Sequence, residues 1–137
     1  MQKMTFIKWH EYNETGIIII DEQHKGIVSI INTLFYLMSI GYDNGLHLRV
    51  INAIKNYSSI HFITEENLLE TSEFKDTEEH KEQHRKLIHD LEQIERNEIK
   101  VHEVNVLLDF LKKWWIEHIN EQDQLYAQHL RESVGAY

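Results

Sequence analysis

Apolar residues recur three or four positions apart along four stretches of this 137-residue chain, and no proline interrupts any of them. That spacing places the apolar side chains on one face of an α-helix, and the absence of proline permits long unbroken helices. We predict helices over about residues 21–40, 46–70, 76–96 and 101–132, joined by short polar segments. Because short joins favour antiparallel neighbours, we expect an all-α, antiparallel up-down-up-down four-helix bundle.

The N-terminal residues, up to about residue 20, lack helical periodicity. They contain Phe6, Trp9 and Tyr12, followed by a run of isoleucines. We interpret this segment as an extended arm that lies across the bundle and covers part of its core with aromatic side chains. Asp21 then offers either a helix N-cap or a first-turn carboxylate, so we place the start of the first helix there.

Composition limits the functions to be considered. The formal net charge is -9, and an acidic surface repels phosphate backbones and anionic lipid, so we expect neither a nucleic-acid nor a membrane partner. No stretch is apolar enough to span a bilayer, the N-terminus lacks a secretory pattern, and the absence of cysteine excludes disulfides and thiolate metal sites. We expect a cytoplasmic monomer, with residues 1–137 forming one domain.

Histidine is abundant, with 10 residues, and several histidines interrupt the apolar faces of the predicted helices. Two helices also place a carboxylate on that face. The candidate ligands are His24 on the first helix, His61 and Glu65 on the second, His80 and His84 on the third, and His118 and Asp123 on the fourth. Burying these groups without a cation would cost on the order of several kcal/mol for each unpaired group. We therefore predict a pair of metal ions inside the bundle.

The other histidines have no paired context, and we interpret them as solvated residues on helix faces. They are His10, His47, His89, His102 and His129.

The spacing of the candidate ligands differs between helices. The pairs on the second and third helices are four residues apart, which stacks each pair on one face. His118 and Asp123 are five apart, which on a regular helix at ~100° per residue separates them by about 140°. Either these two side chains approach the metal pair from two sides, or the turn widens locally as a π-bulge. We favour the first arrangement.

The ligand types favour iron. If both carboxylates bridge the ions, an oxide or hydroxide bridge and three histidines complete six-coordination of one ion, and two histidines leave the other with an open position. Such a set suits iron, whereas structural zinc prefers a closed tetrahedron. The helices lack the Glu-x-x-His pairs of di-iron carboxylate enzymes, and the segment from His80 to His84 does not match the zinc-protease motif.

Four motifs together resemble the hemerythrin family, and within it the single-domain bacterial type. They are Asp-x-Gln-His-Lys at 21–25, His-Phe-x-x-Glu at 61–65, His-x-x-x-His at 80–84 and His-Ile-x-x-x-Asp at 118–123. The similarity spans nearly the whole chain. It implies two non-haem irons with an oxo or hydroxo bridge, and reversible dioxygen binding. Reversibility is also favoured if the hydroxide proton moves to dioxygen as electrons leave the irons, because the charge of the centre then stays constant.

The resemblance also implies a role for each ligand and for the residues around them. His80, His84 and His118 would hold the six-coordinate iron, His24 and His61 the iron that receives dioxygen, and Glu65 and Asp123 would bridge the two. The dioxygen pocket would be lined by Ile27, Phe62, Trp114, Trp115 and Ile119. Trp115 stands where the family usually has a medium aliphatic residue, so we hypothesise that its indole narrows the pocket or donates its N–H to the ligand. We interpret Tyr126 as a packed core residue, with a hydrogen bond to the ligands as the alternative.

The leading functional interpretation is a non-enzymatic oxygen carrier, store or supplier to an oxygen-consuming enzyme. A sensor of oxygen or redox state ranks lower, because without an attached signalling domain it needs a separate signalling partner. A peroxidase or nitric-oxide scavenger at the same open iron is a third alternative. A metal-free bundle for protein interaction is the fallback, and it predicts no iron in the purified protein.

Overall fold

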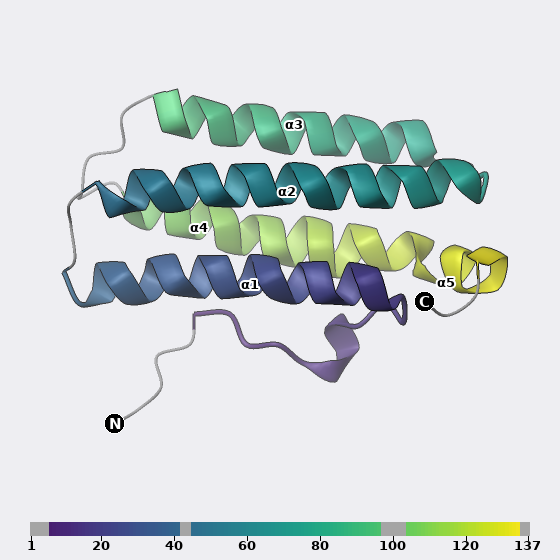
Figure 1. Cartoon of the computed structure of the whole chain (residues 1–137), viewed down its shortest axis with the longest axis horizontal. Helices are drawn as coiled ribbons and strands as arrows, with labels where there is room; N and C mark the ends of the chain where they lie inside the picture. Colours follow the sequence, from purple (N-terminus) through teal and green to yellow (C-terminus); the bar gives the residue numbers. More distant parts are fainter. Residues whose placement is uncertain (1–5, 42–44, 97–103, 135–137) are drawn as a thin grey trace.

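The computed structural model describes residues 6–41, 45–96 and 104–134. Its helices are α1 (Ile18–Ser39), α2 (Leu46–Thr71), α3 (Thr77–Arg96), α4 (Val104–Trp114), the π-helical η3 (Trp115–Gln122) and α5 (Asp123–Val134), and a short 3-10 turn, η1 (Glu11–Asn13), lies in the arm. The segments α4, η3 and α5 follow one another directly and form the fourth rod of the bundle. Successive rods run in opposite directions (Figure 1), which confirms the predicted all-α up-down-up-down four-helix bundle.

The first helix begins at Ile18, three residues before the predicted start, so Asp21 is not an N-cap but a first-turn carboxylate, which was the other alternative. Asp21 lies in the first turn, and its carboxylate accepts hydrogen bonds from the backbone N–H groups of Thr15 (2.8 Å) and Gly16 (3.1 Å). The isoleucines before it already follow the helix, since Ile20 is buried while the two before it are exposed. A run of identical apolar residues shows no periodic contrast, which is why the sequence did not reveal this turn.

The arm lies along α1, as Figure 1 shows. It is attached by two reciprocal hydrogen bonds of 2.8 Å, between the backbone of Ile7 and the side-chain amide of Asn32. Phe6 and Trp9 pack against the core, as predicted. Tyr12 does not, because it is 70% exposed. Of the three aromatic residues of the arm, only the first two therefore cover the bundle, together with the buried Ile7.

Both ends of α2 and the start of α3 lie within one residue of the predicted bounds. The predicted turn at 41–45 and the predicted start of the fourth helix at about residue 101 fall partly or wholly outside the described residues. Within the described ranges, no helix is both long enough and apolar enough to cross a membrane.

The apolar core is divided into two clusters. The larger one fills most of the bundle and includes Ile27, Ile54 and Leu111. The smaller one lies toward the other end and consists of Ile17, Ile20, Leu69, Tyr126 and Leu130. Along α1, the buried residues follow the order Ile20, Asp21, His24, Ile27, so the buried polar residues of this helix lie between the two clusters. The fold thus places a polar layer between two apolar ones.

Candidate metal centre

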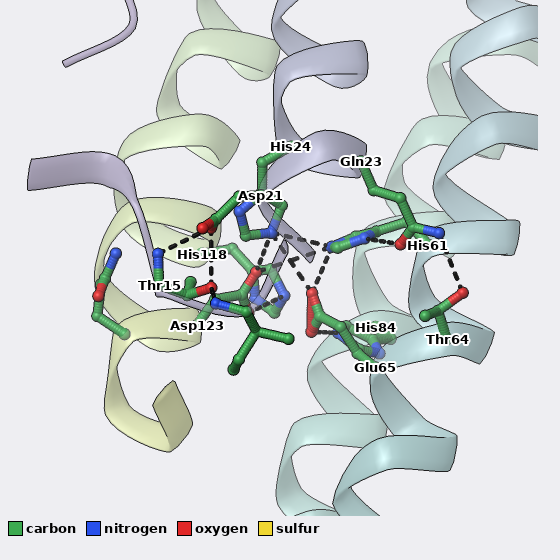
Figure 2. A network of polar contacts seen from close by, with 12 residues as sticks. Thr15, Asp21, Gln23, His24, His61, Thr64, Glu65, His84, His118 and Asp123 are labelled. Carbon is green, nitrogen blue, oxygen red and sulfur yellow. Dashed lines mark hydrogen bonds and ion pairs between the residues drawn. The ribbon is translucent and has the colours of Figure 1, made fainter. Parts of the chain in front are cut away.

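All the predicted ligands meet in this polar layer. Figure 2 shows the side chains of His24 from α1 and of His61 and Glu65 from α2 directed toward Asp123. Each of the candidate ligands is at most 5% exposed. They come from α1 (His24), α2 (His61, Glu65), α3 (His80, His84), η3 (His118) and α5 (Asp123). The four rods of the bundle therefore each contribute at least one of them.

The ligand atoms form two groups that could each hold a metal ion. One group contains His80, His84 and His118, the other contains His24 and His61, and Glu65 and Asp123 belong to both. Within each group the ligand atoms lie within 4.8 Å of one another. The structure thus brings the residues together in the unequal three-plus-two division that the resemblance implied.

Each shared carboxylate directs one oxygen to each group. Glu65 Oε1 lies next to His61 Nε2, while Glu65 Oε2 is 2.9 Å from His80 Nε2. Asp123 repeats the pattern, with Oδ2 at 3.0 Å from His24 Nε2 and Oδ1 at 3.1 Å from His80 Nε2. This is the arrangement that a carboxylate adopts when it bridges two cations.

The two-histidine group has the spacing expected of ligands to one ion. His24 Nε2 and His61 Nε2 are 3.0 Å apart. Two imidazole nitrogens bound at about 2.1 Å from one ion and at a right angle to each other would be about 3 Å apart. The distance is thus compatible with a single ion between the two rings.

Several inward-facing atoms lie close to other ligand atoms without forming a hydrogen bond. Among the described residues, Glu65 Oε1, Asp123 Oδ1, His84 Nε2 and His118 Nε2 are buried and have no hydrogen-bond partner. Each such atom costs about 1–3 kcal/mol in a folded protein. All four are ligand atoms of the two groups, so bound cations would remove the cost. The donor set therefore fits a metal pair.

Electrostatics shows how strongly the cluster attracts positive charge. Burial lowers the pKa of His61, but the carboxylates of Glu65 and Asp123 outweigh burial and raise the pKa to about 9. At His80, too, the two carboxylates outweigh burial and raise the pKa to about 10. Burial dominates at His118 and lowers its pKa to about 4. Protons on some histidines thus compensate the carboxylates when no cation is present, and metal binding has to displace them.

The π-helical stretch explains the five-residue spacing. The backbone N–H of Asp123 donates to the carbonyl oxygen of His118, which is the i→i+5 bond of a π turn. This wider turn brings both side chains to the same face. The favoured hypothesis, in which they reach the metals from two sides of a regular helix, is therefore wrong, and the π-bulge alternative is right. A regular turn would have directed one buried polar group away from its partners.

Two further residues orient the histidines, and sequence reasoning missed both. The outer nitrogen of His61, Nδ1, donates to Gln23 Oε1 at 2.7 Å, and the outer nitrogen of His84 donates to Glu66 Oε2 at 3.2 Å. A proton held on Nδ1 leaves the Nε2 lone pair free for a metal. Glu66 therefore acts on a ligand histidine and is more than a solvated surface charge. Its position next to the ligand Glu65 was the only signal in the sequence.

The residues predicted to line a dioxygen pocket are all buried: Ile27, Phe62, Trp114, Trp115 and Ile119. Two of them lie on different sides of the centre. Trp115 is edge-on to His24 at 6.2 Å between ring centroids, on the two-histidine side. Phe62 stacks on His84 at 3.9 Å, on the three-histidine side. A single pocket formed by all of these residues stays a prediction.

Tyr126 is fully buried in the smaller core cluster, with its ring edge-on to His80 at 5.2 Å. Its hydroxyl has no hydrogen-bond partner among the described residues, but burial and the nearby carboxylates of Asp123 and Glu65 raise its pKa, so the choice between a packed core residue and a hydrogen bond to a ligand stays a prediction. His129 is not a solvated residue, because its Nε2 lies 3.0 Å from the carbonyl oxygen of Ser72. His89 is exposed, as expected. Of the rest, His102 and the side chain of His47 lie outside the described residues.

Comparison with known proteins agrees with this geometry. The family described as "Hemerythrin HHE cation binding domain" matches residues 15–130. A bacteriohemerythrin of Pseudomonas paraeruginosa is 30% identical over 133 residues, which cover 96% of this chain and 86% of that protein. One of Clostridium acetobutylicum is 29% identical over 124 residues, covering 86% of this chain and 96% of that protein. The crystal structure of a hemerythrin mutant superimposes with a TM-score of 0.80 at 25% identity, covering 93% of this chain and 98% of the other.

Proposed function

The chain belongs to the hemerythrin family, and we propose that it binds dioxygen reversibly at a non-haem di-iron centre inside the bundle. The observation that carries the proposal is the sharing of Glu65 and Asp123 between a three-histidine group and a two-histidine group. Two irons with an oxo or hydroxo bridge, when bound there, supply the electrons that dioxygen accepts reversibly. The unequal number of histidines leaves the open position on one ion only.

In this proposal each ligand has the role that its position supports. His80, His84 and His118 would hold one ion, and His24 and His61 would hold the ion that receives dioxygen. Glu65 and Asp123 would be shared between the two ions. The hydrogen bonds from His61 to Gln23 and from His84 to Glu66 keep the Nε2 lone pairs directed inward.

The surrounding side chains keep water away from the open position. His24 and His61 are 0% exposed, and Trp115 covers the edge of His24. Trp9 of the arm in turn packs on Trp115, with ring centroids 5.7 Å apart. An apolar cover slows the delivery of protons to the bound ligand, and this protects reversible binding from irreversible oxidation. We therefore propose a binding protein, an oxygen carrier, store or supplier, in preference to an enzyme.

The test is an ultraviolet-visible spectrum of the purified protein in air, together with iron quantification. We expect two irons per chain, the absorption bands of an oxo-bridged diferric centre, and loss of the oxygenated spectrum under argon with recovery in air. Absence of iron after anaerobic ferrous reconstitution would contradict the metal centre. Rapid turnover of an added reductant, without a stable oxygenated form, would favour the peroxidase or nitric-oxide scavenger.

A further inference from the structure

A buried metal centre needs a path by which ions reach it, and two surface cavities extend to ligand side chains. One is a groove of about 310 Å³ between α2 and α3 that reaches His84. The other is an opening of about 70 Å³ that reaches His80. It is lined by Phe74, Asp76, Glu79, His80, Gln83, Gln122 and Leu125. The two differ in chemistry, because the lining of the groove includes the cation of Arg85, whereas the smaller opening is lined by carboxylates and amides without a lysine or arginine.

We propose that ferrous ions enter the centre through this opening beside His80, which we call the His80 opening. Asp76 and Glu79 attract the hydrated ion at the mouth, and the amide oxygens of Gln83 and Gln122 replace part of its water on the way to His80. This inference rests on the metal centre of the proposed function and adds the route by which the centre is filled.

Charge favours the His80 opening at its outer end. Asp76 and Glu79 are exposed carboxylates at the start of α3 and line the same cavity. The chain as a whole has a formal net charge of -9, so its field already attracts cations. Carboxylate and amide oxygens are ligands that divalent ions accept in exchange for water. The mouth of the opening therefore concentrates cations near His80.

The inner part of the His80 opening offers an oxygen that lacks a partner. Gln83 Oε1 is buried without a hydrogen-bond partner among the described residues, while the amide nitrogen of Gln83 donates to Gln122 Oε1 at 3.4 Å. The opening is small, about 70 Å³, so an ion that passes through it exchanges part of its hydration water for oxygen atoms of the protein. The unpaired amide oxygen compensates part of that loss. His80, at the inner end, belongs to the three-histidine group.

The groove at His84 is less suitable for an ion. The ring of Phe62 stacks on His84 at 3.9 Å and covers the face of the imidazole. Ile63 and Ile88 line the same groove, and its carboxylates, Glu66 and Glu92, are accompanied by the cation of Arg85. Apolar side chains cannot replace the water of a divalent ion, and the guanidinium repels the ion. The ion is thus expected to take the polar route although the groove is wider.

The experiment measures how fast metal-free protein takes up Co²⁺, by stopped-flow absorbance at low ionic strength. Glu79→Gln removes one carboxylate from the His80 opening, and Glu92→Gln removes one from the groove as a matched control on the same helix. We expect uptake to be about fivefold slower in Glu79→Gln and within about twofold of the parent in Glu92→Gln. Asp76→Asn, which keeps a residue suited to a helix N-terminus, should slow uptake further in combination with Glu79→Gln.

All variants should reach the same end point of two Co²⁺ per chain, since none of the altered residues is a ligand. The difference between parent and Glu79→Gln should shrink in about 1 M salt, where the Debye length is about 3 Å. Equal uptake rates in Glu79→Gln and Glu92→Gln would overturn the route, as would slower uptake in Glu92→Gln alone. If the parent takes up no Co²⁺ even at equilibrium, the metal centre itself is refuted. The end point thus tests the centre, and the rate tests the route.

Discussion

The two sides of the centre are built differently, although they share the same bridging carboxylates. On the three-histidine side, His84 donates to a charged partner, Glu66, and is stacked against Phe62. On the two-histidine side, His61 donates to the neutral amide of Gln23, and Trp115 lies against the edge of His24. When the outer nitrogen of an imidazole donates a hydrogen bond to a carboxylate, the inner nitrogen gives its electron pair to a metal more strongly than when the partner is an amide. The three-histidine side thus has a charged outer partner and a surface cavity that reaches His84, whereas the two-histidine side, where the proposed open position would lie, has a neutral outer partner and histidines that are fully buried.

The backbone shows a second contrast between the helices that hold these ligands. On α3, His80 and His84 are one regular turn apart, and both belong to the three-histidine group. On the fourth rod, His118 and Asp123 need a π turn to reach the same centre. Convergence of buried polar groups therefore outweighs regular helix geometry where the two conflict.

The largest effect should come from removing a carboxylate that both histidine groups share, because both metal sites then lose a ligand and the difference between them disappears. Asp123→Ala removes an oxygen from both groups at once, since Asp123 lies within 3.1 Å of His24 Nε2 and of His80 Nε2. Metal affinity should fall by more than about 100-fold, beyond the loss caused by an outer partner alone. Elemental analysis after reconstitution checks this, and retention of both metals would contradict it. His129→Ala, at a histidine outside the centre, is the control.

The second test gives His84 and His61 the same kind of hydrogen-bond partner at their outer nitrogens, which should make the two histidine groups more alike in metal affinity. Glu66→Gln gives His84 a neutral amide partner, like that of His61. We expect metal affinity to fall by about 10-fold or more, because the imidazole becomes a poorer donor. Competition with a chelator measures it. The exposed Glu82→Gln on α3 should leave the affinity unchanged, and an equal loss there would show that only general surface charge matters.

The cover of the open position can be tested from both sides. Trp115→Leu removes the indole beside His24, and dioxygen on- and off-rates should change by about fivefold, as for a barrier change of about 1 kcal/mol. Iron content should stay at the parental value. Phe62→Leu, on the opposite side, should change the rates less. Stopped-flow kinetics of the two variants decide, and a larger effect of Phe62→Leu would place the entry of dioxygen on the three-histidine side.

The smallest effect is expected from a deletion that makes the fourth rod resemble α3. Removing the exposed Glu121 brings His118 and Asp123 to a spacing of four, so a regular turn can replace the π turn. The residues of α5 should then keep the same faces toward the core as in the parent protein. Iron content and the thermal midpoint should therefore stay near those of the parent. Loss of metal or unfolding of the bundle would mean that the π turn does more than accommodate one extra residue.

The ligands could be predicted because each is a polar residue on the otherwise apolar face of its own helix. A histidine or carboxylate on an apolar stripe is visible along one helix without knowledge of the others. Gln23 and Glu66 could not be predicted in this way, because each acts on a histidine of a neighbouring helix. Gln23 of α1 orients His61 of α2, and Glu66 of α2 orients His84 of α3. Their roles become visible only when the helices are packed.

What the sequence alone determined is therefore local: four amphipathic helices, their order, and which faces carry ligand types. Tertiary structure decided how those faces meet, namely the assignment of each carboxylate oxygen to a group and the π turn between His118 and Asp123. Tertiary structure also decided where α1 begins, because the carboxylate of Asp21 accepts a hydrogen bond from the arm that precedes the helix. The physical reason is that side-chain periodicity is set within one helix, whereas the satisfaction of buried polar groups depends on residues as distant in sequence as His24 and Asp123.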